Sequence, residues 1–430
     1  VFWASRSVQM DILVLASTLG VLVPLTRCLD FDLPPVRAWA LAGLAAGLGF
    51  TAKGPVTLVL PGLVIAATAV SSRRASTLLQ PRALALGVGV ATLVSLPWYA
   101  ALWFQGESAF LFEVLIRQNF MRFVDAWDHR QPWWYFLKYL WIDYAPWSWL
   151  LPAAAFTAAR SREEGQLQRQ SWIWIGAIVF FFSLSESKRA PYILPIAPAV
   201  AALAAVVVDR WSRRLQPSGP AHALTALAFG ALGTIFLIGG LALWSPWVEV
   251  PGELQLHARV VGGLVAVWGL LIVTSKWLVR GHPGLSPALL LYGLLWFYVI
   301  ASAWVLPAVN PVKSARAFAG EIDRRVTARG MPIASYRFWD WRAGYAYYAD
   351  REIPNLDRPP ELMAFWRDHD QAYVLVEGAH VDELESLLPS AELAHRARIG
   401  GREAFLFHKP SSVAAADEPG WPATSAAGVP

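Results

Sequence analysis

The residues with the clearest potential for chemistry form a short polar turn between two apolar segments. Glu186, Lys188 and Arg189 lie between apolar runs at about 170–184 and 190–208. Cations beside a membrane span belong on the cytoplasmic side if they serve orientation alone. The charges of the other loops place this turn on the opposite side. A negatively charged ligand at the outer membrane face would account for cations in such a place.

Three further cations on the predicted outer side extend this candidate site. Lys53 precedes Gly54 and Pro55, which predict a tight turn, and Arg122 and Arg130 come from one long loop. Arginine binds phosphate bidentately and lysine binds it as a point charge, so a mixed set suits a phosphate or pyrophosphate at headgroup depth. The predicted phosphate-binding residues are Lys53, Arg122, Arg130, Lys188 and Arg189.

A structural reading of the same cations stays open. Three of them have an acidic neighbour in sequence, and local ion pairs would satisfy these three without a ligand. The pairs would be Lys188 with Glu186, Arg130 with Asp128, and Arg122 with Asp125.

Five more residues are candidate substrate contacts. His129 lies between Asp128 and Arg130, although a lone histidine is more often a hydrogen-bonded structural group. Arg6 and Asp11 flank the outer start of the first apolar segment, where an unpaired carboxylate would be costly. A buried structural pair is an equally good reading of these two. The candidate contacts are Arg6, Asp11, Asn119, His129 and Tyr192.

The composition indicates a polytopic membrane protein. The chain has 430 residues, 56% hydrophobic and 16% charged, with 23 Trp. A soluble protein would carry about 25% charged residues, and many tryptophans suit a protein with two membrane–water interfaces. The basic residues are scattered through short loops rather than gathered in one patch, which argues against nucleic-acid binding. The single Cys28 excludes an internal disulfide.

About ten apolar segments have the length of a span. They are 8–26, 38–52, 55–71, 83–103, 135–158, 170–186, 190–208, 222–244, 258–279 and 285–307. Every second connection between them is basic, and the positive-inside rule assigns that set to the cytoplasm. The remaining connections, including 104–134 and everything after Pro307, are predicted to face outward.

The outward loop 104–134 contains a predicted interfacial helix. Its apolar residues recur at helical spacing, so it is expected to lie flat with that side toward lipid. Glu113 and Arg117 are four apart in the favourable order. The apolar stripe consists of Phe110, Leu111, Val114 and Leu115. A plain anchor helix and a ligand-contacting helix both fit this pattern.

The composition changes after Pro307, which divides the chain into a membrane region at 1–307 and an outward α/β domain at 308–410. A helix is expected over 313–329 and ends at Gly330. Its buried face would consist of Ala315, Phe318, Ile322 and Val326. Three strands and a second helix are expected at 333–336, 373–377, 405–408 and 382–388. The Ala-, Pro- and Ser-rich tail, 411–430, is predicted to be disordered.

Several motifs in the first 200 residues resemble a family of bacterial membrane glycosyltransferases. They are RSVQMD (6–11), KGP (53–55), LPWY (96–99), RQNFMRF (117–123), DHRQPWWYFL (128–137), PWSWLLP (146–152) and SESKRAPYILPIAP (185–198). They are similar to motifs of the group that contains aminoarabinose transferases and dolichyl-phosphate-mannose-protein mannosyltransferases, glycosyltransferase family 39. By this resemblance Lys188 and Arg189 match a Ser-Lys-Arg motif, and Arg122 and His129 match a loop between spans.

The resemblance implies an all-α polytopic fold of the GT-C type with a small extracytoplasmic α/β domain. It implies an inner-membrane enzyme that moves a sugar from a polyprenyl phosphate donor to a hydroxyl of a lipid, protein or glycan acceptor, with inversion, on the extracytoplasmic face. The family carries its catalytic carboxylate in its first outer loop. That loop is expected upstream of Val1, together with the first spans, so no catalytic residue is assigned. No cofactor or metal is expected.

A transporter or flippase for a lipid-linked or anionic substrate is the alternative reading, and a lipid-phosphate-binding scaffold is a third. Transporters place charges near the bilayer midplane, often in repeated halves. Here the notable charges lie in outer turns and loops, and no internal repeat is evident. This pattern favours an enzyme.

Overall fold

The structure is a computed structural model, and it describes residues 10–30, 33–72, 75–124, 129–215, 218–278, 284–338 and 342–410. The chain divides into two compact units. One comprises Val1–Ser245 and Val261–Tyr292, and the other comprises Pro246–Val260 and Gly293–Pro430. The functional division after residue 307 stays a prediction.

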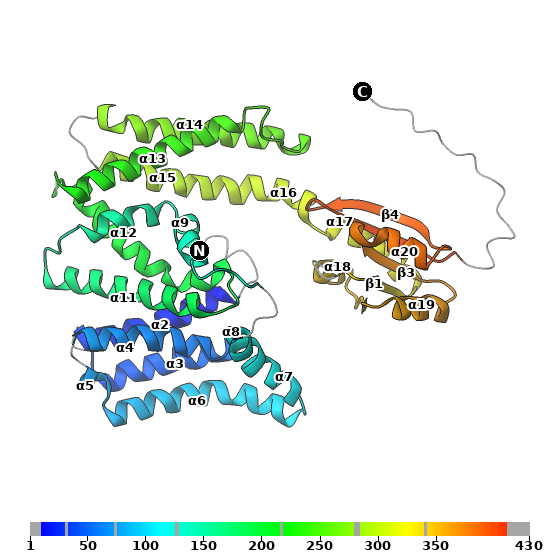
Figure 1. The fold of residues 1–430 in the computed structure, drawn as a ribbon, viewed down its shortest axis with the longest axis horizontal. Coiled ribbons are helices and arrows are strands. Elements are labelled where there is room, and N and C mark those ends of the chain that lie inside the picture. The colour runs from blue at the N-terminus through cyan, green and yellow to red at the C-terminus, as the bar shows by residue number, and fades with distance from the viewer. Residues whose placement is uncertain are drawn as a thin grey trace. The chain divides into compact units, whose positions relative to one another are not determined.

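The first unit is a bundle of helices. The helices up to residue 155 are α2 (Asp11–Asp30), α3 (Pro35–Lys53), α4 (Val56–Ser72), α5 (Ala75–Leu78), α6 (Pro81–Phe104), α7 (Ser108–Phe112), η1 (Glu113–Met121), α8 (Arg122–Val124), α9 (Tyr135–Asp143), η2 (Trp147–Leu150) and α10 (Leu151–Ala155). After these come α11 (Arg162–Leu184), η3 (Ala190–Ile196), α12 (Ala197–Ser212) and α13 (Pro220–Ala242). η4 (Gly252–Leu254) belongs to the second unit, and α14 (Gln255–Leu278) and α15 (Leu285–Ile300) each have residues in both units. Figure 1 shows α2, α3, α4 and α6 side by side.

Six of the described helices are long and apolar enough to cross a membrane. They are Asp11–Leu29, Pro81–Phe104, Ala190–Ser212, Pro220–Ala242, Gly252–Ser275 and Leu285–Lys313, and Val56–Ser72 is a shorter apolar helix. The chain is therefore a multi-pass membrane protein. The apolar stretch predicted at 135–158 is not a single helix, because α9, η2 and α10 occupy it. Pro146 and Pro152 lack the backbone N–H that an uninterrupted helix would need there.

Small residues allow the helices α13 and α14 to approach closely. Gly233 and Gly240 face Gly262 and Gly269, so the contact repeats every seven residues on both helices. A Cβ at Gly262 would lie 2.6 Å from the carbonyl oxygen of Gly240, and one at Gly233 would lie 3.0 Å from that of Gly269. Lipid supplies little hydrophobic force between helices, so such backbone contact contributes much of their attraction.

The core of the first unit lies where α2, α4, α11, α12 and η3 meet. Its members are large aliphatic and aromatic side chains, including Leu22, Leu25, Leu60, Phe136, Ile178, Ile196 and Leu203, each at most 1% exposed. This packing fixes the start of α2 and the whole of η3, which both contribute to the candidate site.

The second unit contains a five-stranded sheet in the order β2-β1-β3-β5-β4. The strands are β1 (Ile333–Tyr336), β2 (Asn355–Leu356), β3 (Tyr373–Glu377), β4 (Glu392–Ile399) and β5 (Arg402–His408). β1 pairs in parallel with β2 and β3, whereas β5 is antiparallel to β3 and β4. The helices are η5 (Ala301–Val305), α16 (Leu306–Lys313), α17 (Arg316–Arg325), η6 (Thr327–Arg329), α18 (Arg342–Tyr348), α19 (Pro359–Asp368), η7 (Gly378–His380) and α20 (Val381–Leu387).

The predicted apolar face of residues 313–329 packs into the core of this unit. Ala315, Phe318, Ile322 and Val326 are at most 8% exposed. The helix over this region is α17 with η6, and it ends where Gly330 adopts a φ of +63°. The predicted fold class is confirmed, whereas the predicted disorder of 411–430 lies outside the described residues.

Candidate functional site

Two loops far apart in sequence are joined beside the polar turn. Arg130 and Ser187 form an antiparallel backbone bridge. The Lys188 N–H donates to the carbonyl oxygen of His129 at 3.0 Å, and the Glu186 N–H donates to that of Phe123 at 3.0 Å. The predicted phosphate-binding residues from the loop 104–134 and from the turn therefore lie close together.

Lys188 is the most buried cation of this cluster, with 4% of its surface exposed. Its Nζ donates to the carbonyl oxygen of Gln131 at 3.1 Å and also to that of Ser185. Burial lowers the pKa of the Lys188 ammonium, and the charge of Glu186 opposes that change. An ammonium has three donors, so these two carbonyls fix the side chain and leave one N–H for another acceptor.

The two arginines of the outward loop, Arg122 and Arg130, contact side chains of the polar turn. Arg122 donates from Nε to Ser187 Oγ at 3.3 Å and from Nη1 to Gln118 Oε1 at 3.1 Å. Arg130 Nη2 lies 3.4 Å from Glu186 Oε2, and both side chains of that pair are largely exposed.

These contacts change one of the local ion pairs considered from the sequence. Glu186 pairs with Arg130 rather than with Lys188, because Lys188 is turned toward backbone carbonyls. The alternative partners of Arg130 and Arg122, Asp128 and Asp125, lie outside the described residues.

Lys53 and Asp11 form a second part of the cluster. Lys53 Nζ lies 2.5 Å from Asp11 Oδ1, and the side chains are 28% and 15% exposed. The same ammonium lies 5.5 Å from the centroid of the Tyr192 ring, within reach of a cation–π interaction. Asp11 is thus paired, as its depth requires, although its partner is Lys53. Arg6, the partner considered from the sequence, lies outside the described residues.

A π-helical segment connects the two parts. η1 has a widened turn in which Asn119 Nδ2 donates to the carbonyl oxygen of Val114 at 2.7 Å. Gly54 has a φ of +70°, and a Cβ there would lie 3.4 Å from Asn119 Nδ2. The turn after Lys53 therefore lies against the helix that leads to Arg122. Single π-helical turns occur often at functional sites.

The predicted interfacial helix exists as α7, η1 and α8. The predicted lipid-facing stripe is mostly wrong, because Leu111, Val114 and Leu115 are half-buried and only Phe110 of its four residues is exposed. The other exposed apolar side chains include Phe112, Phe120 and Met121. Arg117 Nη1 pairs with Glu113 Oε2 at 3.1 Å, which is the contact predicted from their spacing.

His129 and Arg189 lie at the rim of the cluster. The His129 backbone has a φ of +51°, and its carbonyl accepts the Lys188 N–H. The carbonyl of Arg189 accepts the Tyr192 N–H at 3.0 Å, while its side chain is exposed. These two residues shape the turn through their backbones and leave their side chains at the surface.

An apolar cavity of about 440 Å³ lies among α2, α3, α4 and α6. Its walls include Leu25, Trp39, Gly43, Phe50 and Gly87. Phe50 precedes Lys53 by one helical turn, and its carbonyl accepts a hydrogen bond from the Tyr99 hydroxyl at 2.8 Å. The cavity thus extends into the bundle from the helix end that carries Lys53.

The structure therefore brings most of the predicted site residues into one connected cluster. The residues linked by the contacts above are Asp11, Lys53, Asn119, Arg122, Arg130, Lys188 and Tyr192. Sequence reasoning missed the polar groups that hold the cations, namely Gln118, Gln131, Ser185 and Ser187. The serines flanking Glu186 were the available signal, because short hydroxyl side chains often bond to nearby backbone in turns.

Comparison with known proteins identifies the family. No family model matches the chain. The undecaprenyl phosphate-α-4-amino-4-deoxy-L-arabinose arabinosyl transferase 1 of Sodalis glossinidius is 32% identical over 382 residues, which cover 84% of this chain and 67% of that protein. The chain belongs to the aminoarabinose arabinosyl transferase family. The arabinosyl transferase of Pectobacterium carotovorum is 28% identical over 405 residues, covering 87% of this chain and 70% of that protein.

Solved structures agree with this arabinosyl transferase assignment at the level of fold. ArnT from Cupriavidus metallidurans bound to undecaprenyl phosphate has a TM-score of 0.73 and 21% identity, with 96% of this chain and 76% of that chain covered. The apo state of the same protein gives 0.70 and 22%. The predicted family, the GT-C fold and the class of membrane glycosyltransferase are confirmed.

Proposed function

We propose that this chain moves 4-amino-4-deoxy-arabinose from undecaprenyl phosphate to a hydroxyl of a lipid acceptor at the extracytoplasmic face of the inner membrane. Its relatives carry the donor and the sugar in their names. The observation that carries the proposal is the cation cluster, in which Lys53, Arg122 and Lys188 come from three separate parts of the chain. Arg130 and Arg189 add to it, and among the described residues Asp11 and Glu186 are the carboxylates that pair with these cations.

The cluster suits the leaving group of such a transfer. The bond between the anomeric carbon and the phosphate oxygen breaks, and the acceptor oxygen bonds to that carbon from the opposite side. Negative charge grows on the lipid phosphate, so fixed cations stabilise the transition state more than the bound donor. The remaining N–H of Lys188 and the guanidinium of Arg122 are the groups best held for this role.

The apolar cavity supports a donor with an isoprenoid chain. Its walls are aliphatic, aromatic and glycine residues of α2, α3, α4 and α6, and the helix end above Phe50 carries Lys53. A lipid whose phosphate lies at the cluster would place its chain against these helices. The proton of the acceptor hydroxyl would pass to a general base.

The test measures transfer of radiolabelled aminoarabinose from undecaprenyl phosphate in membranes from cells that make the natural gene product. Lys188→Ala and Arg122→Ala should each lower transfer at least about tenfold, since each removes a charge-assisted contact of about 1.5–3 kcal/mol. Arg82→Ala is the matched control, because Arg82 is an exposed cation of a loop predicted to be cytoplasmic. Equal, small effects of all three substitutions would refute the phosphate site. Uptake of the labelled donor without transfer would indicate a transporter.

The proposal also places residues 308–410 outside the cytoplasm. Ser412→Cys, introduced into a Cys28→Ser background, should react with an impermeant maleimide from the periplasmic side. Labelling only after the inner membrane is opened would reverse the assignment of every loop.

A further inference from the structure

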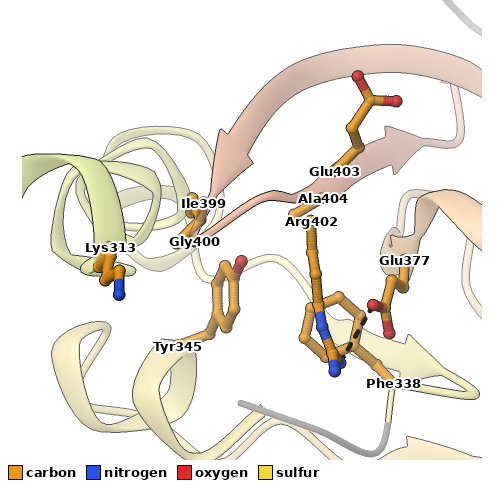
Figure 2. Close-up of a pocket in the computed structure, with 9 residues that line it drawn as sticks. All are labelled: Lys313, Phe338, Tyr345, Glu377, Ile399, Gly400, Arg402, Glu403 and Ala404. Carbon is orange, nitrogen blue, oxygen red and sulfur yellow. Dashed lines mark hydrogen bonds and ion pairs between the residues drawn. The ribbon is translucent and has the colours of Figure 1, made fainter. Parts of the chain in front are cut away.

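A small pocket in the α/β domain, with mostly apolar walls and charged side chains beside it, has no part in the cation cluster. It is lined by residues of α16, α18, β3 and the β4–β5 hairpin, drawn in Figure 2. The pocket encloses about 20 Å³, room for one small polar group, within about 360 Å³ of space that includes its open mouth. A sugar ring does not fit inside it, but one oxygen of a tetrahedral anion does.

Tyr345 is the central feature of this pocket. The residue is 3% exposed, and its ring packs edge-on against Phe318 and Phe338. Figure 2 shows its hydroxyl on the side of Gly400. The hydroxyl has no hydrogen-bond partner within the described part of the chain, and it is not one of the fully enclosed polar atoms, so it is open to the space of the pocket. Burial, with the charge of Glu377 adding to it, raises the pKa of Tyr345 to about 12. At neutral pH the hydroxyl is therefore a donor that lacks an acceptor.

Two cations flank the pocket. Lys313 is exposed and makes no ion pair with a described residue. Arg402 Nη1 lies 3.3 Å from Glu377 Oε1. The positive charge of Arg402 is therefore balanced by the negative charge of Glu377. Glu403 also lines the pocket, but Figure 2 shows its carboxylate turned away, and it pairs with Arg396 at 2.6 Å. The charge of Lys313 is thus the one that remains for a ligand.

The position of Lys313 identifies the kind of ligand. It is the last residue of the apolar helix Leu285–Lys313, the final candidate span of the described chain. The Gly400 N–H donates to the carbonyl oxygen of Val312 at 3.0 Å, so the β4–β5 hairpin is attached where this span ends. The pocket therefore lies beside one end of a candidate span, and phosphate is the abundant anion where a span leaves the hydrocarbon.

We propose that the pocket formed by Lys313, Tyr345 and Arg402 binds the phosphate group of a lipid headgroup. Lys313 supplies the charge, Arg402 lines the pocket, and the Tyr345 hydroxyl donates to the phosphate oxygen that enters the pocket. The site goes beyond the transfer reaction and does not depend on the donor-binding cluster. It anchors the α/β domain to the bilayer surface.

Native mass spectrometry of the full chain in detergent tests the site. The probe is short-chain phosphatidic acid, and the matching diacylglycerol without phosphate is the comparison. Lys313→Ala and Tyr345→Phe should each weaken binding of phosphatidic acid about tenfold, and Lys313→Arg should retain it. Tyr345→Phe keeps the ring packing, so it reports on the hydroxyl alone. Arg329→Ala, an exposed cation of the same domain, should have no effect.

The measurement is repeated on an Arg122→Ala background, which separates this pocket from the proposed donor site. Loss of one bound phosphatidic acid with Lys313→Ala on both backgrounds supports the pocket whatever the outcome for sugar transfer. Competition by inorganic phosphate would mean that the phosphate group alone is sufficient for binding. No competition would mean that the pocket binds phosphate only as part of a lipid. Equal binding of phosphatidic acid and diacylglycerol, or equal binding by Lys313→Ala, Tyr345→Phe and Arg329→Ala, would overturn the proposal.

Discussion

Lys53 and Asp11 join the last residue of α3 to the first residue of α2 through an ion pair of 2.5 Å. Both side chains are partly buried, so neither charge is fully solvated. The pair therefore serves two purposes. It lets a carboxylate exist at the edge of the apolar bundle, and it holds the ammonium beside the ring of Tyr192.

A double-mutant cycle should reveal this coupling. Asp11→Ala and Lys53→Ala should each lower the stability of the detergent-solubilised protein, because each leaves a partly buried charge without its partner. The double variant should lose less than the sum of the two, with a coupling free energy of about 1–2 kcal/mol. Thermal unfolding followed by tryptophan fluorescence measures all three. Strict additivity would mean that the pair contributes nothing beyond the separate side chains.

The lowered pKa of Lys188 predicts a pH dependence of donor binding. Burial makes this ammonium lose its proton below the ordinary lysine value of 10.5. Affinity for undecaprenyl phosphate should therefore fall as pH rises through the lowered pKa. Lys188→Arg should move that fall to higher pH, because guanidinium keeps its proton.

Protein stability should change in the opposite direction over the same range. At pH values between the lowered pKa and 10.5, the unfolded chain binds more protons than the folded chain, so this group's contribution to stability rises with pH. Binding titrations and unfolding curves at matched pH separate the two effects. An unchanged binding profile in Lys188→Arg would exclude Lys188 from the phosphate contact.

Two ion pairs of equal length test how burial changes the contribution of an ion pair to stability. Arg210 Nη2 and Arg213 Nε each lie 2.5 Å from a carboxylate oxygen, of Glu164 and Asp209 respectively. The Arg210 side chain is 7% exposed and also donates to the carbonyl of Ala158, whereas that of Arg213 is 69% exposed.

Arg210→Met should lower the free energy of unfolding by about 3–5 kcal/mol, because it leaves Glu164 without its partner in a poorly hydrated place. Arg213→Met should cost less than about 1 kcal/mol. Similar melting temperatures for the two variants would contradict this assignment.

Neighbouring glycines of α13 provide a matched pair for helix packing. Gly240 lies against the backbone of α14, and Gly239 has open space around the place where a Cβ would be. Gly240→Val should destabilise the protein by about 1–3 kcal/mol, since the backbones must separate. Gly239→Val changes helix propensity equally but meets no neighbour. If both variants unfold alike, the close approach of the two helices has no energetic weight.

Hydropathy and charge predicted most of the membrane region from the sequence, because each span must satisfy its backbone internally. The apolar stretch that is not a single helix, 135–158, contains Pro146 and Pro152 within an otherwise apolar run. Hydropathy does not reveal that the helix is interrupted at these prolines, because the sequence stays apolar across them. In the α/β domain, β4 was missed since Arg396 and Arg398 face outward on an edge strand, which gives it a polar sequence.

The candidate site was predictable in its members but not in its pairings. The positive-inside rule identified Lys53, Arg122 and Lys188 as cations that orientation does not require. Which groups they contact depends on tertiary packing. Nothing in the spacing of Lys188 and Glu186 indicates that one turns toward carbonyls and the other toward Arg130.

The helix that enters the α/β domain continues without a break to Lys313. Residues 293–313 of this helix belong to the same compact unit as the α/β domain. One residue inserted just before Lys313 would lengthen the helix by about 1.5 Å and turn its last residue by about 100°. The length of this connection is therefore constrained.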